Sequence, residues 1–226
     1  MKQVLVYVEG QTEETFVRDV LAPHLFTTCS ISVIPTLART KRTKSGQTFK
    51  GGIVSYGQVK KDLRNLLNTP NVALVTTMID YYGLPDDFPG ISTLPTGTLY
   101  ERVLALQDAF AMDIGSRRFL PFLVLHEFEA LVLTGPKHLA DVLPQYKAKL
   151  ADLQRDINGL PPEEINDGDT THPAARIRQY FPGYQKRLHG PLLVQKIGIE
   201  TIRDKCPHFH DWLTRLESLC TQQEGR

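Results

Sequence analysis

Residues 3–14 read QVLVYVEGQTEE, and this short stretch decides the fold. Its first half, Gln3 to Val8, is apolar and β-branched, which is typical of a buried strand. Gly10 allows a tight turn after Glu9. Thr12 can cap a helix over residues 13–25, with two acids in its first turn, and Pro23 is expected to end or kink that helix. The stretch therefore predicts a strand, a turn that carries a carboxylate, and a helix.

The same alternation continues outward from this stretch as far as residue 133. Further strands are predicted at 31–37, 71–79 and 119–125, and helices at 56–67, 99–110 and 126–133. Pro35 marks the strand at 31–37 as an edge strand. Alternating strands and helices indicate an α/β fold with a mostly parallel sheet and right-handed crossovers.

Acidic residues follow three of the predicted strands. Glu9 comes after the first strand, Asp80 after the third and Glu127 after the fourth. Ligands of such sheets bind beyond the carboxyl ends of the strands. The three strand ends are therefore expected to bring their carboxylates to one edge of the sheet, although loops are polar in general and chance can also place acids there.

The pair Glu9 and Glu13 is the sharpest local feature. Glu13 falls in the first turn of the helix, so its carboxylate can swing back beside that of Glu9. Two adjacent carboxylates stay ionised only with a cation between them, and hard oxygen ligands suit Mg²⁺ or Mn²⁺. The alternative is a capped helix whose acids match its dipole. The position after a strand, together with Asp80, favours the metal site.

Composition excludes several classes of protein. The chain has 226 residues, of which 41% are hydrophobic and 23% charged, so a disordered protein is excluded. No apolar run approaches the roughly 18–20 residues of a membrane span, and the N-terminus lacks the features of a signal peptide. Three cysteines, widely spaced and without a CxxC pair, argue against a disulfide framework and for a reducing cytoplasm.

Charge is distributed unevenly despite a net charge of +1. No acid lies between Asp19 and Asp62. The same stretch carries seven basic residues, Arg39, Lys41, Arg42, Lys44, Lys50, Lys60 and Lys61. A solvated loop is one interpretation. The functional one is a surface that contacts the phosphate backbone of a nucleic acid, formed by residues 39–50.

The pattern changes after residue 134, which gives two segments, 1–134 as an α/β domain and 135–226 as a helical extension packed on it. Short helices are expected at 136–144, 146–157 and 173–181, and two more over 190–219. The extension is expected to act as a lid or a docking surface. The chain has no Walker loop, GxGxxG, HExxH or GxSxG motif, and no lysine two residues after an acid.

Several motifs together carry a family resemblance. They are EGQTEE at 9–14, KGG at 50–52, IDYYGLP at 79–85, HEFEALV at 126–132 and INDGDTTHPAARI at 165–177. The chain resembles, over nearly its full length, an uncharacterised family of small Toprim-like proteins related to the overcoming-lysogenization-defect (OLD) nucleases. Such proteins are often encoded beside a separate ATPase in what look like bacterial anti-phage cassettes.

The resemblance implies roles for particular residues. Glu9 and Glu13 match the first Toprim motif, and Asp80 matches the first acid of the second motif, usually DxD. Tyr82 stands in place of the second acid, so Glu127 or Glu129 is expected to supply the missing ligand. Lys196 is placed where a late lysine of OLD-type domains assists phosphodiester cleavage.

Two functions follow from the resemblance and the site together. The first is a Mg²⁺- or Mn²⁺-dependent nuclease, in which Glu9, Asp80 and Lys196 are catalytic and Glu127 and Glu129 could hold a second metal ion. The second is a non-catalytic or conditionally active subunit that docks on a partner ATPase. In either case the expected location is the cytoplasm, away from membranes, and a homo-oligomer is left open.

Overall fold

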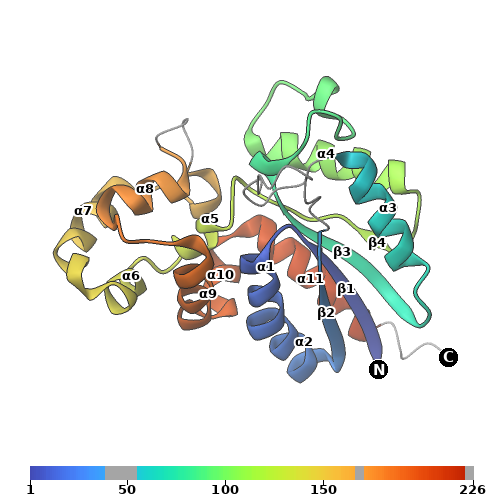
Figure 1. Cartoon of the computed structure of the whole chain (residues 1–226), viewed down its shortest axis with the longest axis horizontal. Coiled ribbons are helices and arrows are strands. Elements are labelled where there is room, and N and C mark those ends of the chain that lie inside the picture. The colour runs from blue at the N-terminus through green and yellow to red at the C-terminus, as the bar shows by residue number, and fades with distance from the viewer. Residues whose placement is uncertain (39–54, 166–170, 222–226) are drawn as a thin grey trace, which may run out of the picture.

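The computed structural model describes residues 1–38, 55–165 and 171–221. Within these residues the chain forms a parallel sheet in the order β2-β1-β3-β4, with β5 also paired to β3 (Figure 1). The strands are β1 (Lys2–Val8), β2 (Ile31–Leu37), β3 (Val72–Asp80), β4 (Phe119–Leu120) and β5 (Leu123–Val124). The predicted α/β fold with a mostly parallel sheet is confirmed, and so is the edge position of β2.

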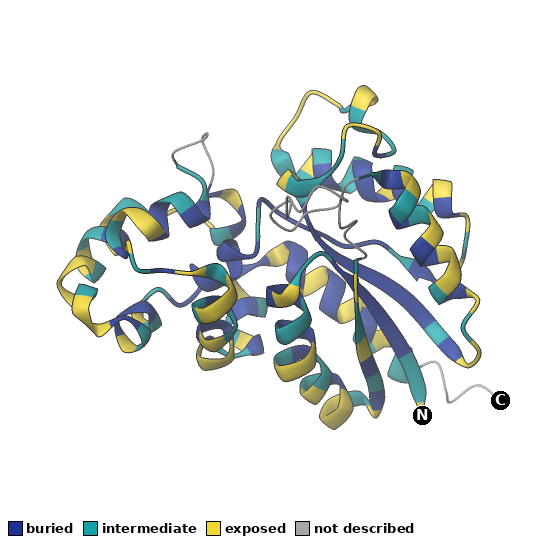
Figure 2. Ribbon diagram, viewed as in Figure 1, coloured by how far each residue is buried: buried dark blue, intermediate teal, exposed yellow. Residues whose placement is uncertain are grey.

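Each face of the sheet carries its own hydrophobic core. Val4, Val6 and Val8 of β1 point into one core, and Leu5 and Tyr7 into the other, because successive side chains of a strand alternate between the faces. The second core is covered by α3 (Tyr56–Leu67) and α4 (Leu99–Ile114). The first is covered by α1 (Gln11–Phe16), α2 (Ala22–Cys29) and α11 (Pro207–Thr221). Figure 2 shows the central strands buried between these helices.

The helix after β1 differs from the prediction in two respects. Gly10, and not Thr12, stands at its N-cap, and Thr12 is buried. Pro23 does not end the helix, which runs on to Cys29. A π-helical segment, Val17–Leu21, precedes the proline. The π-helical segment lies where the N–H missing from Pro23 would otherwise interrupt the helical hydrogen bonds, so it accommodates the proline.

The predicted strand at 119–125 is split in two. Pro121 separates β4 from β5 and has no N–H to donate. The Thr77 hydroxyl bridges the gap: its Oγ1 donates to the Phe122 carbonyl and accepts from the Phe122 N–H, both at 2.8 Å. A side chain of β3 therefore replaces the hydrogen bonds between strand backbones at this point.

The region after residue 128 is helical, as predicted. It contains α5 (Glu129–Val132), α6 (Lys137–Val142), α7 (Leu150–Asp156), α8 (Pro173–Tyr180), α9 (Lys186–Ile197), α10 (Ile199–Lys205) and α11. Two helices were expected over 190–219, and the structure has three in this region. The first of them, α9, begins four residues earlier than predicted and includes Pro191.

One core joins the two predicted segments. It runs from Val4 in the sheet through Leu139 and Leu153 to Phe181. Within α11, the Trp212 ring stacks on Phe122 at 4.2 Å, and its Nε1 donates to Thr76 Oγ1 on β3 at 2.9 Å. The helical segment is therefore packed on the sheet, and the boundary at 134 does not separate two cores.

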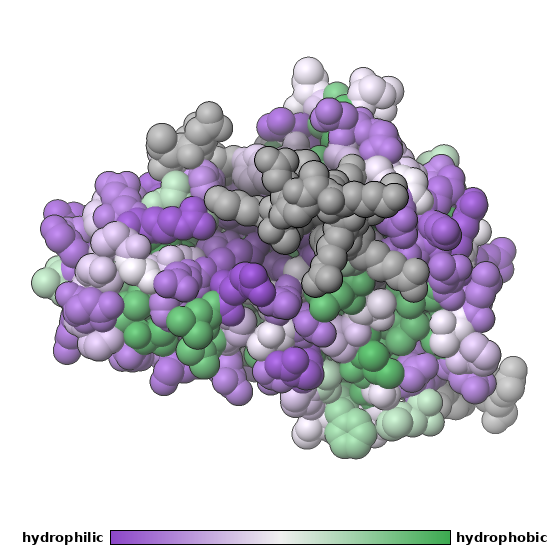
Figure 3. All heavy atoms as spheres, in the orientation of Figure 1, coloured by the Kyte–Doolittle hydropathy of each residue, from purple (hydrophilic) through white to green (hydrophobic). Residues whose placement is uncertain are grey.

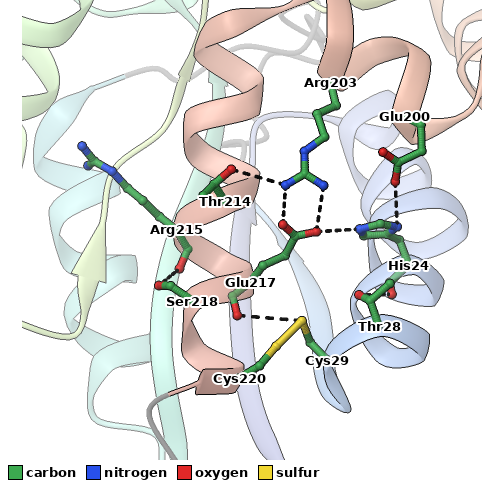
Figure 4. Close-up of polar contacts among 10 residues, drawn as sticks. All are labelled: His24, Thr28, Cys29, Glu200, Arg203, Thr214, Arg215, Glu217, Ser218 and Cys220. Carbon is green, nitrogen blue, oxygen red and sulfur yellow. Dashed lines mark hydrogen bonds and ion pairs between the residues drawn. A yellow bond between two sulfur atoms is a disulfide. The ribbon is translucent and has the colours of Figure 1, made fainter.

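A disulfide corrects the expectation drawn from the cysteines. Cys29 at the end of α2 is bonded to Cys220 in α11, 191 residues later, and Cys206 is a buried free thiol. Wide spacing in sequence did not prevent the pairing, because α2 and α11 cover the same face of the sheet. Beside the bond, Glu217 of α11 interacts with His24 of α2 and with Arg203 of α10, so polar contacts join α11 to both helices (Figure 4).

Among the described residues, no helix combines the length and the apolar composition needed to cross a bilayer.

Candidate active site

Four carboxylates gather at the carboxyl edge of the sheet, and we call them the acid cluster: Glu9, Glu13, Asp80 and Glu129. Glu9 follows β1, Asp80 ends β3, and Glu129 begins α5 shortly after β5. The Lys186 ammonium lies among them. Its Nζ is 2.7 Å from Asp80 Oδ2, 3.1 Å from Glu13 Oε1 and 3.7 Å from Glu129 Oε2. Three separate elements of the fold thus face one cation.

Two glycines leave room for the carboxylates. A Cβ on Gly10 would lie 3.0 Å from Glu13 Oε2, so Glu13 folds back over Gly10 as the sequence suggested. A Cβ on Gly83 would lie 2.9 Å from Glu9 Oε2. The same Glu9 oxygen accepts a hydrogen bond from the Asp80 backbone N–H at 3.2 Å. Gly10 has an extended backbone, so it is its small size that matters here.

The late acids are positioned by an unusual backbone turn. His126 is buried and has a φ of 63°, a left-handed conformation that few non-glycine residues adopt. It redirects the chain between β5 and α5, immediately before Glu127. Strained backbone of this kind is concentrated at functional sites, so the turn is a second sign that this loop has a function.

Glu127 and Glu129 have different surroundings. The Glu129 side chain is fully buried, faces Lys186, and accepts a hydrogen bond from Tyr184 Oη at 3.3 Å. Glu127 Oε1 lies 2.7 Å from both His172 Nδ1 and the Ala174 backbone N–H, at the start of α8. Of the two acids, Glu129 belongs to the acid cluster, and Glu127 anchors α8 beside it.

The lysine of the site is Lys186, which the sequence analysis missed. Lys196 lies exposed in the last turn of the same helix, ten residues later, roughly 15 Å along its axis. The placement of Lys196 in the site is therefore corrected. The structure shows what could have signalled it: Lys186 occupies the first turn of α9, where the helix dipole disfavours a cation, but the helix was predicted to begin only at residue 190. A lysine there calls for acidic partners.

Tyr82, the residue in place of a second motif acid, lies at the rim. Its side chain is 52% exposed and its ring stacks on His126, with centroids 5.5 Å apart. Its hydroxyl lies 3.3 Å from His126 Nδ1. The carboxylate that joins Asp80 in the acid cluster is that of Glu129, from the adjacent strand end.

Burial and mutual repulsion shift the pKa values of the cluster. Burial raises the pKa of Glu9 to about 8, with added repulsion from Asp80 and Glu13. Burial likewise raises the pKa of Asp80 to about 6 and that of Glu129 to about 7, although Lys186 opposes both shifts. Burial lowers the pKa of Lys186, but Asp80, Glu129 and Glu13 outweigh it, so that pKa lies well above its usual value. The single ammonium of Lys186 is therefore too little positive charge to neutralise the four carboxylates of the acid cluster.

The donors suit a hard cation. Asp80 Oδ1, Glu13 Oε1 and Glu129 Oε2 are buried without a hydrogen-bond partner, and the last two are only ion-paired with Lys186. Buried carboxylate oxygens of this kind are ligands for Mg²⁺ or Mn²⁺. Among the described residues, no three acidic, histidine or cysteine side chains are arranged so that they could hold one metal ion. A metal ion can bind to the acid cluster only after the carboxylate side chains rotate and the Lys186 ammonium moves out of the site.

Several predicted features lie outside the described residues. The basic residues Arg39, Lys41, Arg42, Lys44 and Lys50 are among them, as are the KGG motif and the centre of the INDG motif. The flank is described: the Ala38 N–H donates to the Val8 carbonyl at 2.8 Å, one residue before Glu9. Ala38, the last described residue before the basic stretch, thus lies at the edge of the sheet that carries the acid cluster.

The fold and the site define a class: a parallel α/β protein with a buried acid cluster beyond the ends of its strands. The model of one protein family, described as Domain of unknown function (DUF4276), matches residues 8–217, and the chain belongs to this family. The match includes every member of the acid cluster and Lys186. Neither the curated proteins nor the solved structures contain a significant match to the chain.

Proposed function

We propose that the chain is a Toprim-type, metal-dependent phosphodiesterase that cleaves DNA or RNA. In this proposal it is the effector subunit of a bacterial phage-defence system, acting in the cytoplasm with a separate ATPase. One observation carries the enzymatic part: three carboxylates, from α1, the end of β3 and the start of α5, converge on the Lys186 ammonium, with Glu9 beside them, at the edge where parallel sheets bind ligands. The defence context rests on the family resemblance of the sequence motifs.

The metal would be held by the acid cluster. Glu13, Asp80 and Glu129 offer the buried oxygens without hydrogen bonds, and Glu9 lies beside them. Bound there, Mg²⁺ or Mn²⁺ would neutralise charge on a phosphate and lower the pKa of a water molecule. Glu127 does not bind the metal in this proposal, because its carboxylate already contacts His172 and the backbone N–H of Ala174 at the start of α8. It positions the loop that carries Glu129.

The remaining residues provide positive charge for the substrate. Lys186 takes the role first assigned to Lys196, because it already lies within reach of the acid cluster and can neutralise charge that develops on a phosphate. The stretch 39–50 would grip the nucleic-acid backbone without regard to sequence. Its described flank, Ala38, supports this, because it leaves the sheet next to Glu9.

Plasmid nicking by the purified protein tests the enzymatic proposal. We expect Mn²⁺-dependent nicking, reduced at least about 100-fold by Asp80→Asn, since removing one charge-stabilising group commonly costs that much. Asp86→Asn is the matched control, because Asp86 is exposed in the following loop. Glu13→Gln and Glu14→Gln form a second pair, in which only Glu13 contacts Lys186. Circular dichroism checks that each variant folds.

The alternative is a non-catalytic or conditionally active subunit that docks on the ATPase. Two observations favour it: Lys186 already partners the acids, and α9 exposes Leu188 and Leu192 one turn apart. On the face shown in Figure 3, hydrophobic residues gather near α9 and near β2. Absence of nicking in Mg²⁺ and Mn²⁺, combined with tight binding to the ATPase, would support this alternative and contradict the nuclease.

A further inference from the structure

Lys186 occupies the position that a bound metal would need. Its Nζ lies within 3.1 Å of oxygens of both Asp80 and Glu13, and 3.7 Å from Glu129. These are three of the four carboxylates proposed as metal ligands. A metal ion bound to the same oxygens would lie within a few ångströms of the ammonium, where two cations repel strongly in a buried site. The two cations therefore exclude each other.

The backbone that carries Lys186 is held in place. A Cβ on Gly190 would lie 3.2 Å from Phe128 Cε1 and 3.3 Å from both Thr12 Cγ2 and Tyr184 Oη. The first turns of α9 are therefore packed tightly against α1 and the start of α5, and sliding the helix would disturb the core. The Lys186 side chain is different: it is 27% exposed, and its four-carbon stem is flexible.

We propose that Lys186 is a tethered competitor of the divalent cation, so that the acid cluster holds either the ammonium or the metal. This inference rests on the proposed metal site and adds its regulation. Metal binding then requires the Lys186 side chain to swing out while α9 stays in place. The apparent metal affinity is then the intrinsic affinity multiplied by the fraction of molecules in which the ammonium is out of the site. A partner or substrate that draws Lys186 outward would raise that affinity.

Mn²⁺ binding by the protein alone tests the exchange. Free Mn²⁺ is counted by electron paramagnetic resonance in titrations of the wild type and of Lys186→Gln, Lys186→Arg and Lys196→Gln. We expect Lys186→Gln to bind Mn²⁺ at least about tenfold more tightly, as expected when a competitor that fills most sites is removed. Lys186→Arg keeps the competing charge and should stay near the wild type. Lys196→Gln, at the far end of the same helix, should not change the affinity.

The opposite result is equally clear. Unchanged or weaker Mn²⁺ binding by folded Lys186→Gln would overturn the proposal, and so would absence of binding in every variant. A lysine that merely supports the metal site would show weaker binding on substitution.

A second measurement uses the wild type and so does not depend on a variant that folds. Lysine acetylation is followed by mass spectrometry with and without saturating Mn²⁺. We expect Lys186 to become several-fold more reactive when Mn²⁺ is present, while Lys196 stays unchanged. Constant or reduced reactivity of Lys186 would mean that metal and ammonium occupy the site together, which contradicts the exchange.

These experiments separate the two proposals, because neither uses a nucleic acid. Exchange without any nicking would leave the tethered competitor standing and remove the nuclease. Nicking together with Mn²⁺ affinity that is indifferent to Lys186 would leave the nuclease standing and remove the competitor.

Discussion

At the scale of single residues, glycines set how closely the carboxylates approach the turns that carry them. Gly83 leaves room for both carboxylate oxygens of Glu9, since a Cβ added at residue 83 would lie only 2.9 Å from Oε2 and 3.0 Å from Oε1. If residue 83 carried a Cβ, the Glu9 side chain would have to move, and the hydrogen bond that it accepts from the Asp80 N–H would be weakened. The position of Glu9 thus depends on a residue in another strand's loop.

Gly83→Ala is therefore expected to weaken Mn²⁺ binding about tenfold or more, in line with substitutions beside metal ligands. Gly57→Ala is the control. Gly57 lies in the first turn of α3 with open space around it, so alanine should stabilise the helix by about 0.5–1 kcal/mol. Equal Mn²⁺ affinity in both variants would show that Glu9 takes no part in binding.

The acid cluster also predicts how stability depends on pH. The pKa values of Glu9, Glu129 and Asp80 are raised to about 8, 7 and 6 by burial and repulsion. The folded state therefore holds these protons more tightly than the unfolded state. Their stabilising effect is full near pH 4 and is lost as the pH rises through 6 to 8. Metal-free protein should become less stable across that window.

Urea denaturation at pH 5.5, 7 and 8.5 measures this dependence, with and without Mn²⁺. The stabilisation by Mn²⁺ should grow over the same window, because the metal needs deprotonated carboxylates. Burial raises the pKa of Glu163 to about 7 as well, and Glu163 lies near α11 instead. Glu9→Gln isolates the cluster: if the variant shows the full wild-type loss of stability, the cluster is not its source.

Glu9, Glu13 and Asp80 could be located from the sequence, because it shows directly which residues follow a predicted strand. The sequence could not choose between Glu127 and Glu129, since that choice depends on the left-handed turn at His126 and on α8 reaching Glu127. Lys186 lies 106 residues from Asp80. Nothing in the local pattern connects the two except a cation at a helix start.

At the scale of elements, the interrupted fourth strand depends on one hydroxyl. Thr77 Oγ1 makes two buried hydrogen bonds with the Phe122 backbone. Thr77→Val keeps the shape and leaves two backbone groups unpaired, at a cost of about 1–3 kcal/mol each when buried. We expect the free energy of unfolding to fall by about 2–5 kcal/mol. Thr93→Val, which removes an exposed hydroxyl bonded to Gly90, should cost far less.

Element boundaries were predicted best where the hydrophobic pattern is simple. Tyr56–Leu67 is a helix with the predicted bounds, because its apolar residues lie on one face. Predictions from prolines had mixed outcomes: Pro35 lies on the edge strand β2 as expected, but Pro23 does not end its helix. Pro23 and Pro191 lie inside helical segments, where a π-helical turn and packing against neighbours accommodate them. The composition of a segment does not reveal such tertiary compensation.

At the scale of the whole molecule, the Cys29–Cys220 disulfide joins the first and last helices that cover one face. Reduction should lower the free energy of unfolding by about 2–5 kcal/mol, since the bond closes a long loop. Mn²⁺ affinity should not change, because Cys29 precedes β2 and so lies at the amino edge of the sheet, opposite the acid cluster. Denaturation with and without a phosphine reductant measures the first effect.

The doubly substituted protein, Cys29→Ser with Cys220→Ser, provides the control, because the reductant should have no effect on it. If reduction weakened Mn²⁺ binding as strongly as it lowered stability, the two edges of the sheet would be coupled. The site would then depend on the redox state of its surroundings.

Lys186 comes from a helix that follows the sheet, and this has a consequence for translation. All four acids have left the ribosome's catalytic centre once Glu129 is made, and Lys186 is added 57 residues later (186 − 129). At ~5–20 residues per second, that interval is roughly 3–11 s. During those seconds the nascent chain lacks the lysine that contacts the acids in the folded protein. A cation that the acids hold in that interval would come from solution or from another part of the chain, and the Lys186 ammonium would replace it later.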